Sequence, residues 1–171
     1  MASLLSFSVT GEEAVKAGLA ALLESVQDLR PFWKDVFAPK YFAMVQDLFA
    51  TGGRARGGGG QFKGGAWAGL SPTYRVWKNK HYPGQPILVR EGRLRGSLMW
   101  NGTALGMDGI FDAQPSFVIA GTAVPYGKFH QEGTSTMPAR SFLPPPDPAV
   151  FAPLLQAWLI KAQQTGSASG S

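Results

Sequence analysis

The amino-acid sequence predicts an α+β domain in which amino- and carboxy-terminal helices pack on a small, mostly antiparallel sheet. Apolar residues recur at helical spacing near both ends of the chain. Between Met99 and Ala120 this period is lost, and turn-forming residues separate two or three short apolar stretches, which is the pattern of short strands. The glycine-rich stretch from Gly52 to Gly69 predicts a long projecting loop.

The length of 171 residues fits one domain with one core. We assign residues 1–165 to it and residues 166–171 to a flexible Gly/Ser tail. Charged residues make up only 16% of the chain, which favours a surface used for partners. The absence of cysteine excludes disulfides and thiolate metal sites. No apolar run has the length of a transmembrane helix and the first residues lack a basic signal region, so we expect a cytoplasmic product without a membrane partner.

The amino-terminal third predicts a short strand at Ser3–Val9 and then two helices. A capping box at Thr10–Glu13 begins the first helix, which ends near Arg30. The second helix continues to about Ala50, with a kink or break at Pro39 and an aromatic core face. A coiled-coil seam would have the same spacing as the first helix, but we expect its apolar stripe to face the core. That stripe comprises Val15, Leu19, Leu22, Val26 and Leu29.

Helices also flank the strand region. One is predicted at Thr73–Lys80, after the Ser71-Pro72 start, and one over residues 88–98, with its arginines outward and two glycines that weaken it. After the three prolines at residues 144–146, Asp147 begins a last helix that runs to about Gln164.

The stretch from Gly121 to Leu143 combines unusual backbone requirements with several polar side chains. A strand at Phe117–Ala120 leads into it, and Pro125 opens a short helical turn that Gly133 ends. We predict that a set of residues holds this structural motif together: Gly121, Tyr126, His130, Gln131, Gly133, Pro138 and Phe142.

This stretch resembles the tail-completion or virion-morphogenesis family of tailed bacteriophages. The matching residues are Gly121-Thr122, then Pro125-Tyr126, then His130-Gln131-x-Gly133, and then the run at residues 138–143. An upstream block at residues 70–98 has the same order as the family's leucine- and arginine-rich block, so the resemblance covers roughly residues 67–143. The chain departs from the family pattern at three positions: Glu91, Gly127 and Ser141.

The resemblance implies a non-enzymatic virion protein at the neck or head-proximal end of a phage tail, needed for tail completion and head-tail joining. It implies a homo-oligomeric ring, six copies favoured and twelve possible, that touches connector and tail-tube or terminator proteins. DNA would pass through the ring without sequence-specific binding. The protein would be made in the host cytoplasm and end in the virion.

The charge distribution leaves two interpretations open. Residues 54–95 carry nine of the 16 basic side chains and one carboxylate, so this segment is +8 and the remainder is −3. The segment could bind nucleic-acid phosphates, or it could be one half of a head-to-tail subunit contact. We favour the subunit contact because the segment is expected to lack the interleaved aromatic residues that single-strand binders use.

Catalytic chemistry is not predicted. His81 and His130 have no companions at metal-ligand spacing, and no phosphate-binding loop or nucleophile elbow occurs. We therefore expect no enzyme activity, no cofactor and no metal. His130 is expected to hold a turn through both ring nitrogens.

The predicted assembly residues come from the loop, the basic segment and the end of the motif. Phe62 and Trp67 are expected to have nothing local to bury against, which would make them anchors on a neighbour. Arg140 has two alternatives at even weight: an inter-subunit contact, or intrachain bonds to strand-end carbonyls or the Tyr126 hydroxyl. The full set is Arg54, Arg56, Phe62, Lys63, Trp67, Arg93, Arg95 and Arg140.

Overall fold

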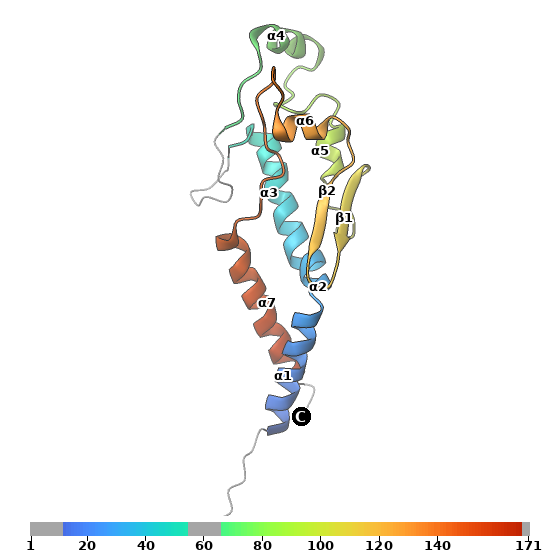
Figure 1. Ribbon diagram of the computed structural model, residues 1–171, viewed down its shortest axis with the longest axis vertical. Coiled ribbons are helices and arrows are strands. Elements are labelled where there is room, and N and C mark those ends of the chain that lie inside the picture. Colours follow the sequence, from blue (N-terminus) through green and yellow to red (C-terminus); the bar gives the residue numbers. More distant parts are fainter. Residues whose placement is uncertain (1–11, 55–65, 169–171) are drawn as a thin grey trace, which may run out of the picture.

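The computed structural model describes residues 12–54 and 66–168, and it confirms the predicted α+β class. Over these residues the molecule is elongated, with α1 and α7 at one end, α4 at the other, and α3 beside a two-stranded sheet between them (Figure 1). The elements in chain order are α1 (Glu12–Gln27), α2 (Arg30–Phe32), the π-helical turn η1 (Trp33–Phe37), α3 (Ala38–Thr51), α4 (Pro72–His81), α5 (Arg93–Ser97), β1 (Gly109–Ala113), β2 (Val118–Thr122), α6 (Gly127–Glu132) and α7 (Pro148–Ala168).

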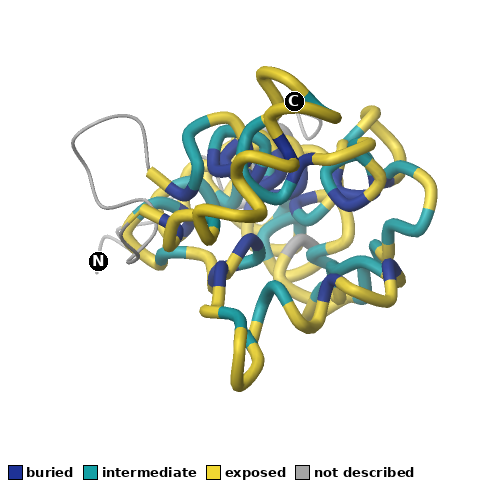
Figure 2. The backbone as a smooth tube through the Cα atoms, turned by 90° about the horizontal axis from the view of Figure 1, so that it is seen from above, coloured by how far each residue is buried: buried dark blue, intermediate teal, exposed yellow. Residues whose placement is uncertain are grey.

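Helix α3 forms the centre of the core. It is buried on several sides, because Phe111 of the sheet, Phe151 of α7, and Trp67 and Phe142 from two loops all pack against it. Its buried residues are Ala38, Tyr41, Phe42, Met44, Val45, Leu48 and Phe49. Viewed along the long axis, the buried segments of the chain are short and are flanked by exposed backbone (Figure 2). The elongated shape therefore leaves much of the chain at the surface.

The deformation predicted at Pro39 is a π-helical turn immediately before it. In η1 the amide of Ala38 donates to the carbonyl of Trp33, five residues back, instead of four. Proline has no N–H and its ring would crowd the carbonyl four residues earlier, so a wider turn lets the helix continue through it. The helix is thus continuous from Arg30 to Thr51.

The sheet is a hairpin of β1 and β2. The strands are antiparallel and pair Phe111 with Ala120 and Asp112 with Ile119. Phe111 lies on the inner face, where its ring contacts Phe42 of α3 at 6.3 Å between centroids. Alternation along each strand places Ile110 and Ile119 on the outer face, and both are exposed.

The terminal helices α1 and α7 run antiparallel and pack mainly against each other (Figure 1). The predicted inward stripe on α1 is wrong for Val15, Leu19 and Val26. Together with Leu23 they are 52–61% exposed, whereas Gly18 is buried. Small residues on α1 let the two helix backbones approach closely, and this turns the large apolar side chains outward.

Two other predicted boundaries change. The helix expected over residues 88–98 is only the five-residue α5, because Leu88 (φ 65°) and Gly92 (φ 87°) adopt left-handed backbone conformations. Helix α7 begins as predicted, with an Asp147 oxygen accepting from the Ala149 amide at 2.9 Å. It continues to Ala168 and so includes part of the segment predicted as a flexible tail. The predicted strand Ser3–Val9, the Thr10 cap and loop residues 55–65 lie outside the described residues.

Candidate functional site

A cavity of about 610 Å³ lies at the α4 end of the molecule, among α4, α6 and the loops before and after them. It brings together several residues that the sequence singled out, namely Arg93, Tyr126, His130, Pro138 and Arg140. Four Lys or Arg side chains line it against one carboxylate, Glu91. The remaining wall is largely apolar or aromatic and includes Leu70, Tyr74, Leu88, Val89, Leu94 and Met137.

Two of the lining cations are buried, and both hydrogen-bond to neutral backbone carbonyls. Lys78 is 3% exposed, and its ammonium donates to the carbonyls of Gln85 and Pro86. Arg140 is 5% exposed; its Nε donates to the carbonyl of Ala68 at 2.8 Å and its Nη2 to that of Gly69 at 2.9 Å. Burial lowers the pKa of the Lys78 ammonium and of the Arg140 guanidinium. Of the two alternatives for Arg140, the structure contains the intrachain bonds, made to carbonyls of the segment before α4.

His130 faces the same cavity. Its Nδ1 is buried and has no hydrogen-bond partner among the described residues, so the expectation that both ring nitrogens hold the turn is wrong. Burial, and secondarily the charge of Arg140, lower the pKa of its imidazole. The turn is held instead by the backbone, because the Arg140 amide donates to the His130 carbonyl at 2.7 Å. The Tyr126 ring packs edge-on against His130, with centroids 5.9 Å apart.

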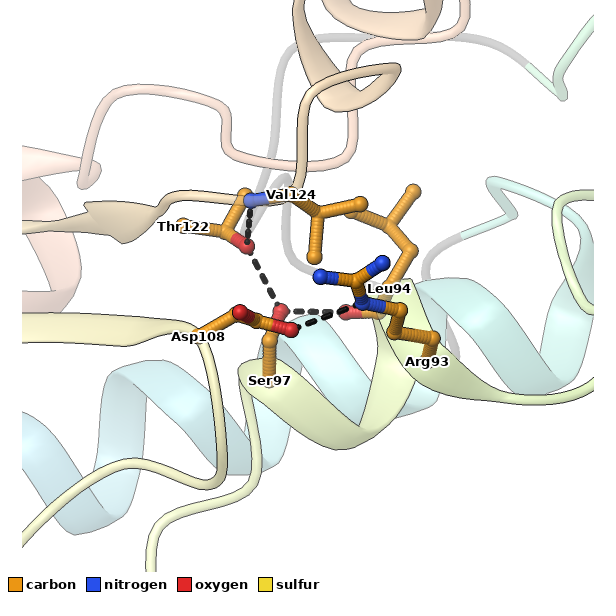
Figure 3. A network of polar contacts seen from close by, with 6 residues as sticks. All are labelled: Arg93, Leu94, Ser97, Asp108, Thr122 and Val124. Atoms are coloured by element: carbon orange, nitrogen blue, oxygen red, sulfur yellow. Dashed lines mark hydrogen bonds and ion pairs between the residues drawn. The ribbon is translucent and has the colours of Figure 1, made fainter.

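The cations at the cavity rim are already paired. Arg90 lies 3.0 Å from the Glu91 carboxylate, and both side chains are more than half exposed. Arg93 donates from Nε to Asp108 at 2.8 Å (Figure 3), and this hydrogen bond lowers the pKa of that carboxyl. These pairs at the surface contribute little to folding stability, and each brings the net charge at its part of the cavity mouth close to zero.

Gln131 links helix α6 to the end of the predicted motif at residues 141–143. Its Oε1 accepts from the amides of Phe142 (3.0 Å) and Leu143 (3.1 Å), and its Nε2 donates to the Leu143 carbonyl and the Ser141 hydroxyl. Gly133 ends α6 with φ 79°, and a Cβ there would lie 2.7 Å from the amide nitrogen of Ala139. Phe142 is buried against the core. Gly121, by contrast, has open space around it and an ordinary strand conformation.

A second polar network joins α5 to the end of β2 (Figure 3). The Ser97 hydroxyl donates to the Leu94 carbonyl at 2.8 Å and lies 2.7 Å from the Thr122 hydroxyl. The Thr122 oxygen also accepts from the Val124 amide. Because the Ser97 proton is used on Leu94, Thr122 must be the donor between the two hydroxyls.

The prediction that Trp67 has no local partner is wrong. It is buried, its ring packs edge-on against Phe49 at 5.6 Å, and its Nε1 donates to the Ser141 carbonyl at 3.0 Å. It therefore fastens the base of the glycine-rich loop to the core. Arg95 donates to the Gln46 side chain, at 2.9 Å between Nε and Oε1. Arg54 is exposed, and Arg56, Phe62 and Lys63 lie outside the described residues.

Helix α4 carries a row of stacked aromatic rings that was not predicted from the sequence. Tyr74, Trp77 and His81 stack in succession on its surface, with centroids 5.5 and 4.7 Å apart. Exposed Arg75 and Lys80 lie on the same helix. The expectation that the basic segment lacks interleaved aromatic residues is therefore wrong, and the helical spacing of these rings was the signal for it.

Two apolar surfaces have no covering element within residues 12–54 and 66–168. The first is the α1 stripe, formed by Val15, Leu19, Leu23 and Val26. The second is the sheet face, formed by Ile110, Phe117 and Ile119. Among the described residues no cluster of three potential metal ligands occurs, and no helix has the length and apolar character needed to cross a membrane.

Comparisons of this chain with family models, with curated proteins and with solved structures find no match.

Proposed function

We propose that this protein is a structural virion component of a tailed bacteriophage, forming a ring at the neck or head-proximal end of the tail. In this role it completes the tail and joins it to the head, acts without catalysis, and lets DNA pass without reading its sequence. The proposal starts from the motif resemblance over residues 67–143. Six copies are favoured from the symmetry that the resemblance implies.

The observation that carries the proposal is the pair of uncovered apolar surfaces. A closed ring needs two different patches on each subunit, one that meets the preceding copy and one that meets the next. The α1 stripe is a helical ridge, and the sheet face is a flat surface of exposed branched and aromatic side chains. Helices pack on sheets in this way inside domains, so the two surfaces suit each other across a subunit boundary. We propose the α1 stripe of one copy on the sheet face of the next.

Charge separation along the molecule supports head-to-tail association in general, although it does not select the sheet face as the surface that α1 meets. Helix α4 contains Arg75, Lys78 and Lys80 and no carboxylate, whereas α1 contains three glutamates and one lysine. These helices lie at opposite ends of the molecule (Figure 1). Opposite charges at opposite ends steer copies into one relative orientation and disfavour the reverse one.

The test is native mass spectrometry of the purified protein and of Leu23→Glu. Leu23 lies within the α1 stripe and points away from α7, so the substitution leaves the fold intact and places a charge in the apolar contact. The parent is expected as a closed oligomer and the variant as a monomer. Ala20→Glu is the matched control, because Ala20 is exposed on α1 but lies off the stripe. A parent that stays monomeric at high concentration, and that is absent as rings from assembled particles, would contradict the proposal.

Non-specific binding of single-stranded nucleic acid through the basic segment is the alternative function. One observation favours it, namely the exposed Tyr74–Trp77–His81 stack beside Arg75 and Lys80. Bases stack on such rings while cations neutralise phosphates. Fluorescence anisotropy with a labelled single strand tests it. If the parent binds the strand, if its affinity falls as the salt concentration rises, and if Trp77→Ala does not bind, this function is favoured. If the parent and Trp77→Ala bind the strand with equal affinity, this function is excluded.

A further inference from the structure

We propose that the cavity at the α4 end is an anion-binding site that takes a carboxylate or phosphate group carried on an apolar or aromatic stem. This inference goes beyond the ring proposal and stands whether or not the protein forms a ring. It rests on two buried cations that have no carboxylate partner, and on the size and lining of the cavity.

The buried cations lack an opposite charge. Lys78 and Arg140 are each at most 5% exposed, yet their hydrogen bonds go to neutral carbonyls. A buried charge is costly unless a charged partner compensates it, and carbonyl dipoles compensate it only in part. Glu91 is the one carboxylate in the lining, and it is exposed at the rim beside Arg90. A bound anion would supply the missing charge.

Donor capacity remains for such an anion. An ammonium has three N–H groups, and Lys78 uses two of them on the carbonyls of Gln85 and Pro86. The guanidinium of Arg140 uses Nε and Nη2, so its Nη1 is left over among the hydrogen bonds of the described residues. The imidazole of His130 lines the same cavity, but its Nδ1 is enclosed by protein, so the ring contributes to the wall and not to the donor set.

The size and lining of the cavity also indicate the chemistry of the rest of the ligand, to which the anionic group is attached. A volume of about 610 Å³ lies within the range of small-ligand sites. Tyr74, Leu88, Val89, Leu94 and Met137 form an apolar part of the wall, which favours a stem that is apolar or aromatic. Leu88 holds a left-handed backbone conformation (φ 65°) in that wall, a strained state that persists where the surrounding structure imposes it. A free metabolite and an acidic side chain of a partner protein both have this chemistry.

The experiment is a titration of the full-length protein followed by amide chemical shifts. The probes are phenyl phosphate, inorganic phosphate, benzyl alcohol and a blocked Phe-Glu dipeptide. Phenyl phosphate or the dipeptide is expected to shift the amides of Val89, Gly92 and Met137 saturably while leaving Ile160 unchanged. Benzyl alcohol, which lacks the charge, is expected to bind at least about tenfold more weakly. Binding of phenyl phosphate supports a free ligand, and binding of the dipeptide alone supports a protein segment.

Two lysine variants separate the site from general surface attraction. Lys78→Met is expected to raise the Kd of the probe that binds the parent by at least about tenfold. Lys80 is exposed on the same helix, and Lys80→Met is expected to change that Kd by less than about twofold. Equal losses in both variants would overturn the proposal. So would the absence of saturable shifts in the parent protein, a result that does not depend on how Lys78→Met folds.

Discussion

The hydroxyl oxygens of Ser97 and Thr122 lie 2.7 Å apart and link α5 to the end of β2. Thr122 donates to Ser97 and accepts from the Val124 amide, so its hydroxyl serves both neighbours. Thr122→Val keeps the shape and removes both bonds, and we expect the free energy of unfolding to fall by about 1–3 kcal/mol. Chemical denaturation measures this. Thr73→Val, at an exposed position of α4, is the control and should change stability by less than about 0.5 kcal/mol.

Glycine substitutions should differ sharply between two sites. A Cβ at Gly106 would lie 2.1 Å from the Gly96 carbonyl oxygen, whereas a Cβ at Gly121 meets nothing within 4 Å. Gly106→Ala is therefore expected to lower the free energy of unfolding by about 1–3 kcal/mol. Gly121→Ala is expected to leave the free energy of unfolding unchanged or to raise it slightly. Thermal unfolding of both variants tests this. If the two variants have equal melting temperatures, the backbone at Gly106 is not in close contact with the backbone at Gly96.

Gln131→Glu tests how much the hydrogen bonds between Gln131 and residues 142–143 stabilise the fold. The carboxylate can still accept from the Phe142 and Leu143 amides, but it loses the donor to the Leu143 carbonyl and meets that oxygen with a negative charge. We expect a loss of about 1–3 kcal/mol in the free energy of unfolding. Exposed Gln156→Glu on α7 gives the same change in charge without these partners. If both variants unfold alike, the Gln131 bonds contribute nothing beyond charge.

His130 should make stability depend on pH in a defined direction. Its folded-state pKa is lowered below the ordinary value of 6.5, so the unfolded chain binds a proton more readily than the folded one. Its contribution is therefore constant above about pH 6.5 and falls as pH drops through 6.5 toward the folded pKa. Unfolding at pH 8, 7, 6 and 5 should show a steeper loss for the parent than for His130→Gln. Parallel curves would contradict the prediction, whereas a bound anion would flatten the slope of the parent.

Local patterns predicted local structure well. The Ser71-Pro72 start, Gly133 at the end of α6 and the Asp147 cap each depend on residues near in sequence, and the structure has all three features. The apolar stripe predicted for the first helix has the right period, but Val15, Leu19 and Val26 are exposed, whereas Leu22 and Leu29 are half-buried. Periodicity identifies a helix with one apolar face, yet it does not show which neighbour covers that face.

The site was harder to predict because it depends on distant residues. Lys78 is buried by turns that follow it, and Arg140 binds carbonyls 71 and 72 residues away. Trp67 was predicted to lack partners because its neighbours in sequence are small. Its contacts with Phe49 and the Ser141 carbonyl exist only after the chain has folded.

The π-helical turn η1 changes the phase of the helix that contains it. One extra residue in a turn rotates all following side chains by about 100° relative to those before it. Phe32, on one side of η1, contacts Trp158 of α7, whereas Phe42, on the other side, contacts Phe111 of the sheet. Tyr41, also after η1, still packs on Phe151 of α7. The part of the helix after η1 therefore contacts the sheet and α7 together, and removing one residue between Trp33 and Phe37 would turn Tyr41 and Phe42 away from these partners.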